Sequence, residues 1–202
     1  MPANAGAAGP IAVSAAQLAA IAGAPTRLMP ALAGWLTALC PGCGIDTPQE
    51  LAHFLAQACH ETDGFRTLRE YASGEAYEGR ADLGNTRPGD GVRFRGRGIF
   101  QTTGRANYLA LGLRKGRRDL FVNAPELLEQ PEHAVWSACA YWMARGLNDI
   151  AGQPDSARLH KKLRGRVLEV SPVEFIGIAI NGGLNGMPRR KALYARAREV
   201  LG

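Results

Sequence analysis

The sequence lacks the features that would place the chain in a membrane or a secretory route. It has no run of about 18 apolar residues, the length that a membrane-spanning helix needs. Its first residues, MPANAGAAGPIAVSAAQ, show no basic segment ahead of an apolar stretch, so they do not form a standard secretory signal. We therefore expect a chain made in the cytoplasm, and a target outside it would require a separate release step.

Cysteine is scarce and is not arranged as a disulfide framework. Cys40 and Cys43 have C-x-x-C spacing, but no second C-x-x-C or H-x-x-H pair follows at zinc-ribbon distance. Cys59 and Cys139 lie in apolar helical patterns, which predicts core positions. The sequence therefore predicts no metal site and no cofactor, and it leaves the role of the first pair open.

The chain is basic, with a formal net charge of +6, so it should be attracted to polyanions such as nucleic acid, anionic lipid or anionic cell-wall polymer. Charge alone does not choose among these partners. The 202 residues fit one domain, or one domain built from two closely packed lobes. Residues 1–12 are rich in Ala, Gly and Pro and are expected to be flexible, and residues 13–202 to form a single domain.

Helix signals dominate the rest of the chain. Capping-box patterns at Ser14, Thr47 and Ser171 each have Gln or Glu three residues later and precede an apolar pattern. Apolar spacing predicts further helices over 28–39 and 131–146, a short one over 159–163, and a basic terminal helix from Pro188. We expect a mainly α fold of about seven helices, with at most a short strand or hairpin near 92–94.

Residues 69–98 interrupt these patterns with seven glycines and six arginines and no sustained periodicity. A loop this long in a compact domain is usually functional or disordered. We therefore look for functional residues in and around this segment.

Glu61 stands where a glutamate is a poor structural choice. The Thr47 start and the Gly64 stop place His60 and Glu61 in the last turn of a helix. Unsatisfied carbonyls give that turn a partial negative charge, which favours a protonated carboxyl group and hence a general acid. The alternative is a frayed surface residue, although the apolar face ending at Ala58 places Glu61 at the edge of the core.

A glycoside hydrolase needs a second carboxylate, and an inverting enzyme separates its two carboxyl groups by about 6.5–9.5 Å to leave room for a water. Glu70 follows Glu61 by nine residues and is the first candidate for this partner. Spacing alone leaves rivals open in the same loop, namely Glu75, Glu78, Asp82 and Asp90.

The segment Gly96–Gly104 offers groups suited to a sugar. It lacks the Gly-Lys-Ser/Thr ending of a phosphate-binding P-loop. Its glycines allow close backbone approach to a ligand, and Gln101, Thr102 and Thr103 supply neutral hydrogen-bonding groups. Asn107 and Tyr108 follow, and they either line the same groove or simply pack.

Three stretches resemble glycoside hydrolase family 19, which contains chitinases and the lysozyme-like endolysins of bacteriophages. FLAQACHETDGFR resembles the helix bearing the catalytic acid, GRGIFQTTGRANY the substrate-groove signature, and AINGGLNG a later Asn-Gly-Gly motif, in the family's order. The resemblance implies a mainly α, lysozyme-like fold of two lobes flanking a substrate cleft. One departure is Asp63, which stands before Gly64 where the family commonly has small residues.

The resemblance also implies roles for individual residues. Glu61 looks like the general acid, Glu70 like the general base in the short-loop arrangement of the endolysin branch, and Thr103 like the hydroxyl that holds the attacking water. It implies no metal and no cofactor. The expected substrate contacts are His60, Tyr71, Gln101, Asn107, Tyr108, Asn181 and Arg190.

The expected function is an endolysin-type peptidoglycan hydrolase that cuts β-1,4 glycosidic bonds with inversion. A basic chain without a secretion signal favours anionic peptidoglycan over neutral chitin, and it fits an enzyme that is made in a bacterial host's cytoplasm and acts on the cell wall after release by a separate pore-forming protein. The alternatives are a chitinase, a non-catalytic glycan-binding protein, and a basic nucleic-acid-binding helical protein.

The expected partners follow from the same reasoning. They are peptidoglycan strands and an anionic outer-membrane surface, and not nucleic acid, with the chain a monomer. The outer-membrane contact would be made by the cations of the terminal helix, unless these form only a solvated face: Arg189, Arg190, Lys191, Arg196 and Arg198.

Overall fold

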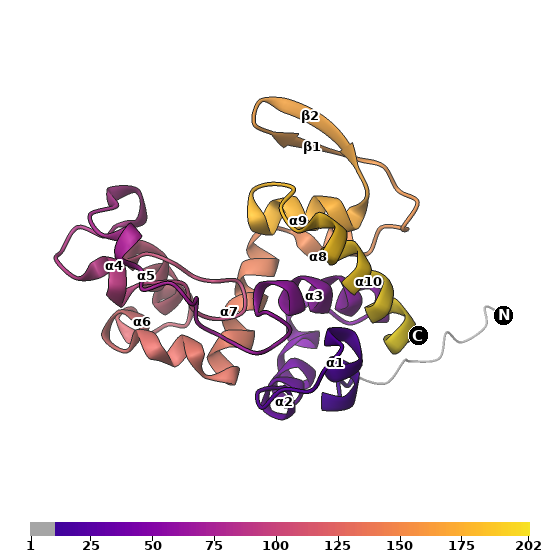
Figure 1. The fold of residues 1–202 in the computed structure, drawn as a ribbon, viewed down its shortest axis with the longest axis horizontal. Coiled ribbons are helices and arrows are strands. Elements are labelled where there is room, and N and C mark those ends of the chain that lie inside the picture. Colours follow the sequence, from indigo (N-terminus) through magenta and orange to yellow (C-terminus); the bar gives the residue numbers. More distant parts are fainter. Residues whose placement is uncertain (1–10) are drawn as a thin grey trace.

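A computed structural model describes residues 11–202 as a mainly helical domain with one small sheet (Figure 1). The expectation of a flexible stretch over 1–12 falls mostly outside the described residues. The helices are α1 Ala15–Ala22, α2 Met29–Leu39, α3 Pro48–Glu61, α4 Asp90–Arg93, α5 Arg105–Arg114, α6 Leu120–Asn123, α7 Pro131–Ala144, α8 Leu147–Ala151, α9 Pro172–Asn181 and α10 Met187–Leu201, and the strands are β1 Leu159–Leu163 and β2 Arg166–Val170.

The two larger apolar cores each form one lobe of the domain, and a third, smaller cluster lies under the sheet. The larger core surrounds α3, whose residues from Leu51 to Cys59 are all buried, and draws on α1, α2, α7, α8, α9 and α10. The smaller core joins Phe94, Tyr108, Phe121 and Leu128. Figure 1 shows α4, α5 and α6 on one side, α1, α3 and α10 on the other, and α7 between them. The predicted mainly α fold of two lobes is confirmed.

The capping signals in the sequence start the helices as expected. At Ser14 and Thr47 the two reciprocal hydrogen bonds of a capping box are present. At Ser171 the Glu174 carboxylate accepts from the Ser171 N–H and hydroxyl. Helix α3 ends at Glu61, and Gly64 follows with a φ of 71°, the left-handed conformation that ends many helices. His60 and Glu61 therefore lie in the last turn of α3, as predicted.

The strand predicted at 92–94 is wrong, because residues 90–93 form the helical turn α4. The buried Asp90 carboxylate fixes this turn by accepting hydrogen bonds from the Arg87 N–H and from the Arg105 side chain. This long-range pairing overrides the short alternation Val92-Arg93-Phe94.

The helix predicted over 159–163 is also wrong, because this stretch is β1 and pairs antiparallel with β2. Arg164 and Gly165 connect the strands with φ values of 49° and 80°, as in a two-residue hairpin turn. Residues 159–163 alternate between half-buried and exposed, with Leu159 and Leu163 on the inner face. The sequence predicts at most one short hairpin, and the described residues contain one, although at a different place in the chain.

Over residues 11–202, no helix combines the length and the apolar character that crossing a membrane requires.

Candidate active site

Glu61 ends α3 and is held by a buried arginine from α10. Arg190, whose side chain is 1% exposed, donates to Glu61 Oε1 at 2.5 Å and to Gln57 Oε1, one turn earlier on α3. The Glu61 side chain is 20% exposed, so one side of it faces solvent. The Arg190 guanidinium group is therefore ion-paired with the Glu61 carboxyl group at the C-terminal end of α3.

Glu70 lies in the irregular segment after α3, and both of its carboxylate oxygens are fixed. Oε1 accepts a hydrogen bond from the Gly96 N–H at 2.7 Å, and Oε2 accepts one from the Tyr77 hydroxyl at 2.9 Å. Burial, followed by the hydrogen bond to Glu70, raises the pKa of Tyr77, which keeps that hydroxyl a donor at neutral pH. The contacts orient Glu70 without an arginine partner, unlike Glu61.

Gly96 is the point where the second carboxylate meets the Gln-Thr-Thr segment. A Cβ added to Gly96 would lie 2.7 Å from Gln101 Oε1, 3.3 Å from Thr103 Oγ1 and 3.4 Å from the Glu70 carboxyl carbon. Gln101 adopts a φ of +49°, and its buried Oε1 accepts no hydrogen bond from the protein. An acceptor, a hydroxyl and a carboxylate are thus grouped beside Gly96, and each of them can hydrogen-bond to a water or a sugar hydroxyl.

A surface cavity of about 360 Å³ contains both glutamates. It shares two lining residues, Gln101 and Thr103, with a second cavity of about 320 Å³ between α5 and α7. The two cavities adjoin at these two residues, and together they are called the groove below. The first is lined by His60, Glu61, Asp63, Thr67, Arg69, Glu70, Tyr71, Tyr77, Gln101, Thr103 and Arg189.

The rival carboxylates of the loop do not line this groove. Glu78 accepts hydrogen bonds from the Gly89 and Gly91 N–H groups, Asp82 pairs with Arg80, and Asp90 pairs with Arg105. Glu75 is exposed on a short 3₁₀ turn. Among these acids, only Glu70 lines the same cavity as Glu61.

Four of the predicted substrate contacts line the groove. His60, Tyr71 and Gln101 line the cavity of the two glutamates, and Asn107 lines the adjoining one. Tyr71 is 78% exposed and donates to Asp63 at 3.1 Å, which holds its ring at the rim. Burial and the nearby Arg190 lower the pKa of His60, so its ring is neutral at pH 7.

The other three predicted contacts do not line the groove. Tyr108 is fully buried and donates to the Arg95 carbonyl, so it packs in the smaller core. Arg190 is buried behind Glu61 and acts on the carboxyl group. Asn181, at the end of α9, lines neither cavity. Their motif positions gave no sign of which way these side chains point.

Sequence reasoning missed several groove residues. Tyr77 orients Glu70, and Arg69 and Arg189 line the cavity with no motif to identify them. Tyr141, in the adjoining cavity, donates to the Ala179 carbonyl and so joins α7 to α9. The apolar spacing of α7 predicts helix there, but it does not separate a groove residue from a core residue.

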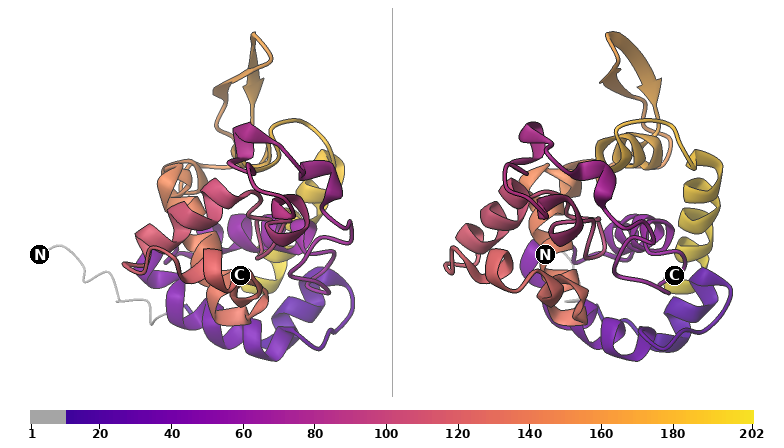
Figure 2. Two further views of the ribbon diagram at one scale, coloured as in Figure 1. Left: turned by 90° about the vertical axis from the view of Figure 1, so that its left-hand side faces the viewer. Right: turned by 60° about the vertical axis from the view of Figure 1, so that its left-hand side comes forward.

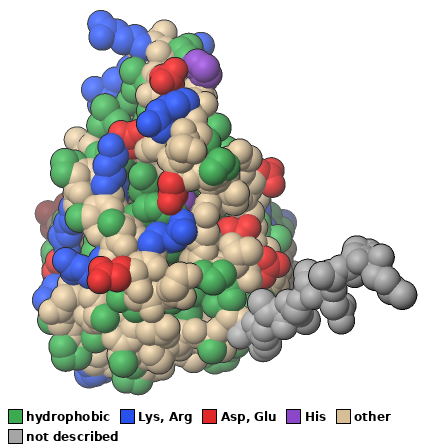
Figure 3. All heavy atoms as spheres, turned by 90° about the vertical axis from the view of Figure 1, so that its right-hand side faces the viewer, with side chains coloured by type: hydrophobic (Ala, Val, Ile, Leu, Met, Phe, Trp, Pro, Cys, Tyr) green, Lys and Arg blue, Asp and Glu red, His purple; other side chains and the backbone are tan. Residues whose placement is uncertain are grey.

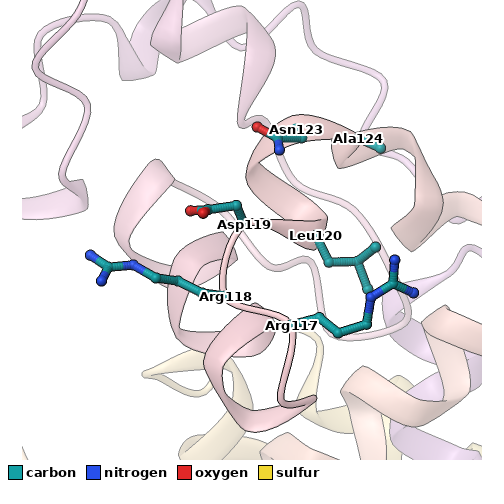
Figure 4. Close-up of a pocket in the computed structure, with 6 residues that line it drawn as sticks. All are labelled: Arg117, Arg118, Asp119, Leu120, Asn123 and Ala124. Atoms are coloured by element: carbon teal, nitrogen blue, oxygen red, sulfur yellow. The ribbon is translucent and has the colours of Figure 1, made fainter.

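Another pocket lies on the turn before α6, away from both glutamates (Figure 4). Its lining carries one carboxylate, Asp119, and none of the residues of the three motifs. In the part of the chain that the structure describes, no three His, Cys, Asp or Glu side chains are grouped to hold a metal ion, and the four cysteines are free thiols.

Gly96 gives a test of the site that depends on geometry alone. We expect Gly96→Ala to lower kcat/KM by about tenfold, the cost of roughly 1.4 kcal/mol in transition-state binding, because the new methyl group displaces the Gln101 side-chain oxygen. The closest atom is the end of a flexible side chain, so the thermal midpoint should shift little. Steady-state kinetics and a melting curve measure the two effects, and a folded variant with wild-type kcat/KM would contradict this geometry.

Comparisons with known proteins agree with the motifs. No family model matches the chain. A curated Haemophilus influenzae protein, named as a glycosyl hydrolase family 19 domain-containing protein, is 28% identical over 182 residues, covering 75% of this chain and 80% of that protein. These 182 aligned residues support the resemblance to family 19 that the three motifs predicted.

Two solved structures share the fold. Chitinase C from Streptomyces griseus aligns with a TM-score of 0.65 at 21% identity, over 98% of this chain and 96% of that one. A bacterial family 19 chitinase aligns with a TM-score of 0.61 at 22% identity, over 94% and 95% of the two chains. The chitinase-like fold expected from the sequence is therefore confirmed.

Proposed function

The chain has the motifs and the fold of glycoside hydrolase family 19, and from that premise we propose that it hydrolyses the β-1,4 glycosidic bonds of bacterial peptidoglycan with inversion. The observation that carries the proposal is the pair of glutamates in one cavity, each held by different groups. Two carboxyl groups in unlike surroundings are what a separate acid and base require.

In the proposed reaction Glu61 donates its proton to the glycosidic oxygen. Glu70 accepts a proton from a water, which Thr103 helps to hold, and the water attacks the anomeric carbon from the opposite face of the sugar. Glu70 has both oxygens fixed by Gly96 and Tyr77, which lowers the reorganisation needed to orient that water. The unpartnered Gln101 oxygen beside it can accept a hydrogen bond from the water or from a sugar hydroxyl or amide.

Charge supports peptidoglycan as the substrate. The chain carries a net charge of +6, and peptidoglycan bears carboxylates on its stem peptides, whereas chitin is neutral. Electrostatic attraction raises the rate of encounter with an anionic polymer and is weakened by salt.

We propose that the chain acts on the cell wall of the bacterium that makes it, after a separate protein lets it through the membrane.

Chitin is the second candidate substrate, because the two solved structures described above are named chitinases. The nucleic-acid alternative has less support. Arg97 pairs with Glu129 and Arg105 pairs with Asp90, so these two guanidinium groups are engaged within the fold. Glu61 and Glu70 in the groove would also repel phosphate.

The test is a parallel digestion of purified sacculi and of soluble chitin oligomers with products followed by mass spectrometry. We expect muropeptides from sacculi at a kcat/KM at least about tenfold above that for chitin oligomers, a difference of about 1.4 kcal/mol. Cleavage of chitin with intact sacculi would replace peptidoglycan by chitin as the substrate. Cleavage of neither would contradict the proposed function.

A further inference from the structure

The β1–β2 hairpin stands away from the rest of the domain and is anchored by one face. Figures 1 and 2 show it projecting beyond α9. Val170, Ile178 and Met187 form a small apolar cluster under it, with the partly buried Leu159 and Leu163 packed against that cluster. The hairpin is therefore held to α9 and the start of α10 by its inner side chains, while its outer face remains in solvent.

The hairpin is strongly cationic, above all at its tip, where Lys162, Arg164 and Arg166 are exposed. Five basic residues occur between positions 158 and 166, and the one acid on the two strands is Glu169. In Figure 3 Lys and Arg side chains gather at the projecting end of the molecule. Within residues 11–202 none of the five pairs with a carboxylate, although the Lys161 ammonium lies 4.1 Å from the centre of the Phe175 ring: Arg158, Lys161, Lys162, Arg164 and Arg166.

The terminal helix α10, which the sequence suggests as the anionic contact, is different. Arg190, Lys191 and Arg198 pair with Glu61, Glu174 and Asp155 respectively. Arg189 lies 3.9 Å from Asp63, and Arg196 donates to the Ile21 carbonyl. The five cations of α10 therefore serve contacts inside the domain, whereas those of the hairpin have no acidic partner among the described residues.

Like charges that are concentrated on one small projection repel one another, which destabilises the hairpin. A bound polyanion neutralises these charges and so relieves the repulsion. We propose that the cationic tip of the β1–β2 hairpin, residues 162–166, docks the acidic stem peptides of peptidoglycan outside the catalytic groove. The inference rests on the proposed function and extends it from the bond cut to the polymer that carries the bond. Lys162 pairs with Val167, and Leu163 with Arg166, so Lys162 and Arg166 flank the turn on opposite faces of the hairpin. Both are exposed, as is Arg164 in the turn between them, so an acidic peptide that reaches the tip meets several unpaired cations.

The test measures sedimentation with purified sacculi in a Glu61→Gln background, which limits digestion during binding. Lys162→Gln/Arg166→Gln removes two hairpin charges, and Arg117→Gln/Arg118→Gln removes two exposed charges at the pocket of Figure 4. Basic residues near an anionic surface contribute roughly fivefold each to binding, so we expect the hairpin pair to weaken binding by on the order of tenfold or more. The control pair should weaken it by less than about twofold.

Equal losses for the two pairs, or unchanged binding by the hairpin pair, would overturn the docking proposal. It would also be overturned if the hairpin pair altered sedimentation with anionic phospholipid vesicles or DNA while leaving that with sacculi unchanged. Muropeptide release by the unmodified chain is scored separately. If the unmodified chain releases muropeptides but the hairpin pair binds sacculi normally, the docking proposal is wrong and the proposed function stands. If the unmodified chain releases no muropeptides, the proposed function itself is wrong.

Discussion

Replacing Glu61 by glutamine is expected to lower kcat on the cleaved glycan by about 10²–10⁴-fold, the range that a general acid contributes. The amide keeps the shape of the side chain and offers an oxygen to Arg190, but it has no proton to give to the leaving oxygen. Binding to the glycan should persist, because Gln101, Thr103 and Asn107 still line the groove. Single-turnover rates and glycan sedimentation separate the two effects.

Glu75→Gln is the matched control for this substitution. It removes one negative charge from the neighbouring loop at an exposed position that lines neither cavity. We expect its kcat to stay within about twofold of wild type, since surface substitutions rarely exceed 0.5 kcal/mol. Near-wild-type lysis by Glu61→Gln would contradict the assignment of the acid, and a large loss in Glu75→Gln would restore Glu75 as a candidate base.

Replacing Arg190 by methionine is expected to lower the free energy of unfolding by about 3 kcal/mol, the lower end for breaking a buried ion pair. The substitution leaves Gln57, which is fully buried, without its donor and leaves Glu61 without its cation. Urea denaturation measures the loss. Because Arg190 contacts Glu61 and not the groove, kcat should also fall, by about tenfold or more, with a smaller change in KM.

Arg190→Lys distinguishes a positioning role from simple loss of stability. Lysine keeps the charge but lacks the planar fork that reaches Gln57 and Glu61 together, so both losses should be partial. If Arg190→Met had the same urea midpoint of unfolding as the wild type, the buried pair would not stabilise the fold. If kcat were normal in a folded Arg190→Met variant, Arg190 would have no role in placing Glu61.

Local chemistry made the helix framework predictable. The Thr47 capping box sets the start of α3 from four residues of sequence, and Gly64 marks its end, which together placed Glu61 in the last turn. The Gln101–Thr103 segment was identified by composition, since glycines and neutral polar groups in one stretch suit a sugar. The structure brings it beside Glu70.

Contacts distant in sequence could not be predicted in the same way. Arg190 reaches Glu61 across 129 positions, and nothing local distinguishes it from the other cations of α10. Tyr108 lies one position after Asn107 in the same motif, yet the helix turns its ring into the smaller core. The hairpin was mistaken for a helix because Leu159 and Leu163 are four apart, a spacing that fits one helix face and one strand face equally.

The central claim is hydrolysis of the glycan by acid–base chemistry at Glu61 and Glu70. Its most direct test is digestion of sacculi in ¹⁸O-labelled water, followed by mass spectrometry of the new reducing ends. The account predicts a hydrated reducing end carrying one heavy oxygen, with reducing N-acetylmuramic acid or N-acetylglucosamine identifying the bond cut, and no such product from Glu61→Gln. A 1,6-anhydro end without heavy oxygen would show that no water attacks, and it would contradict the hydrolytic mechanism.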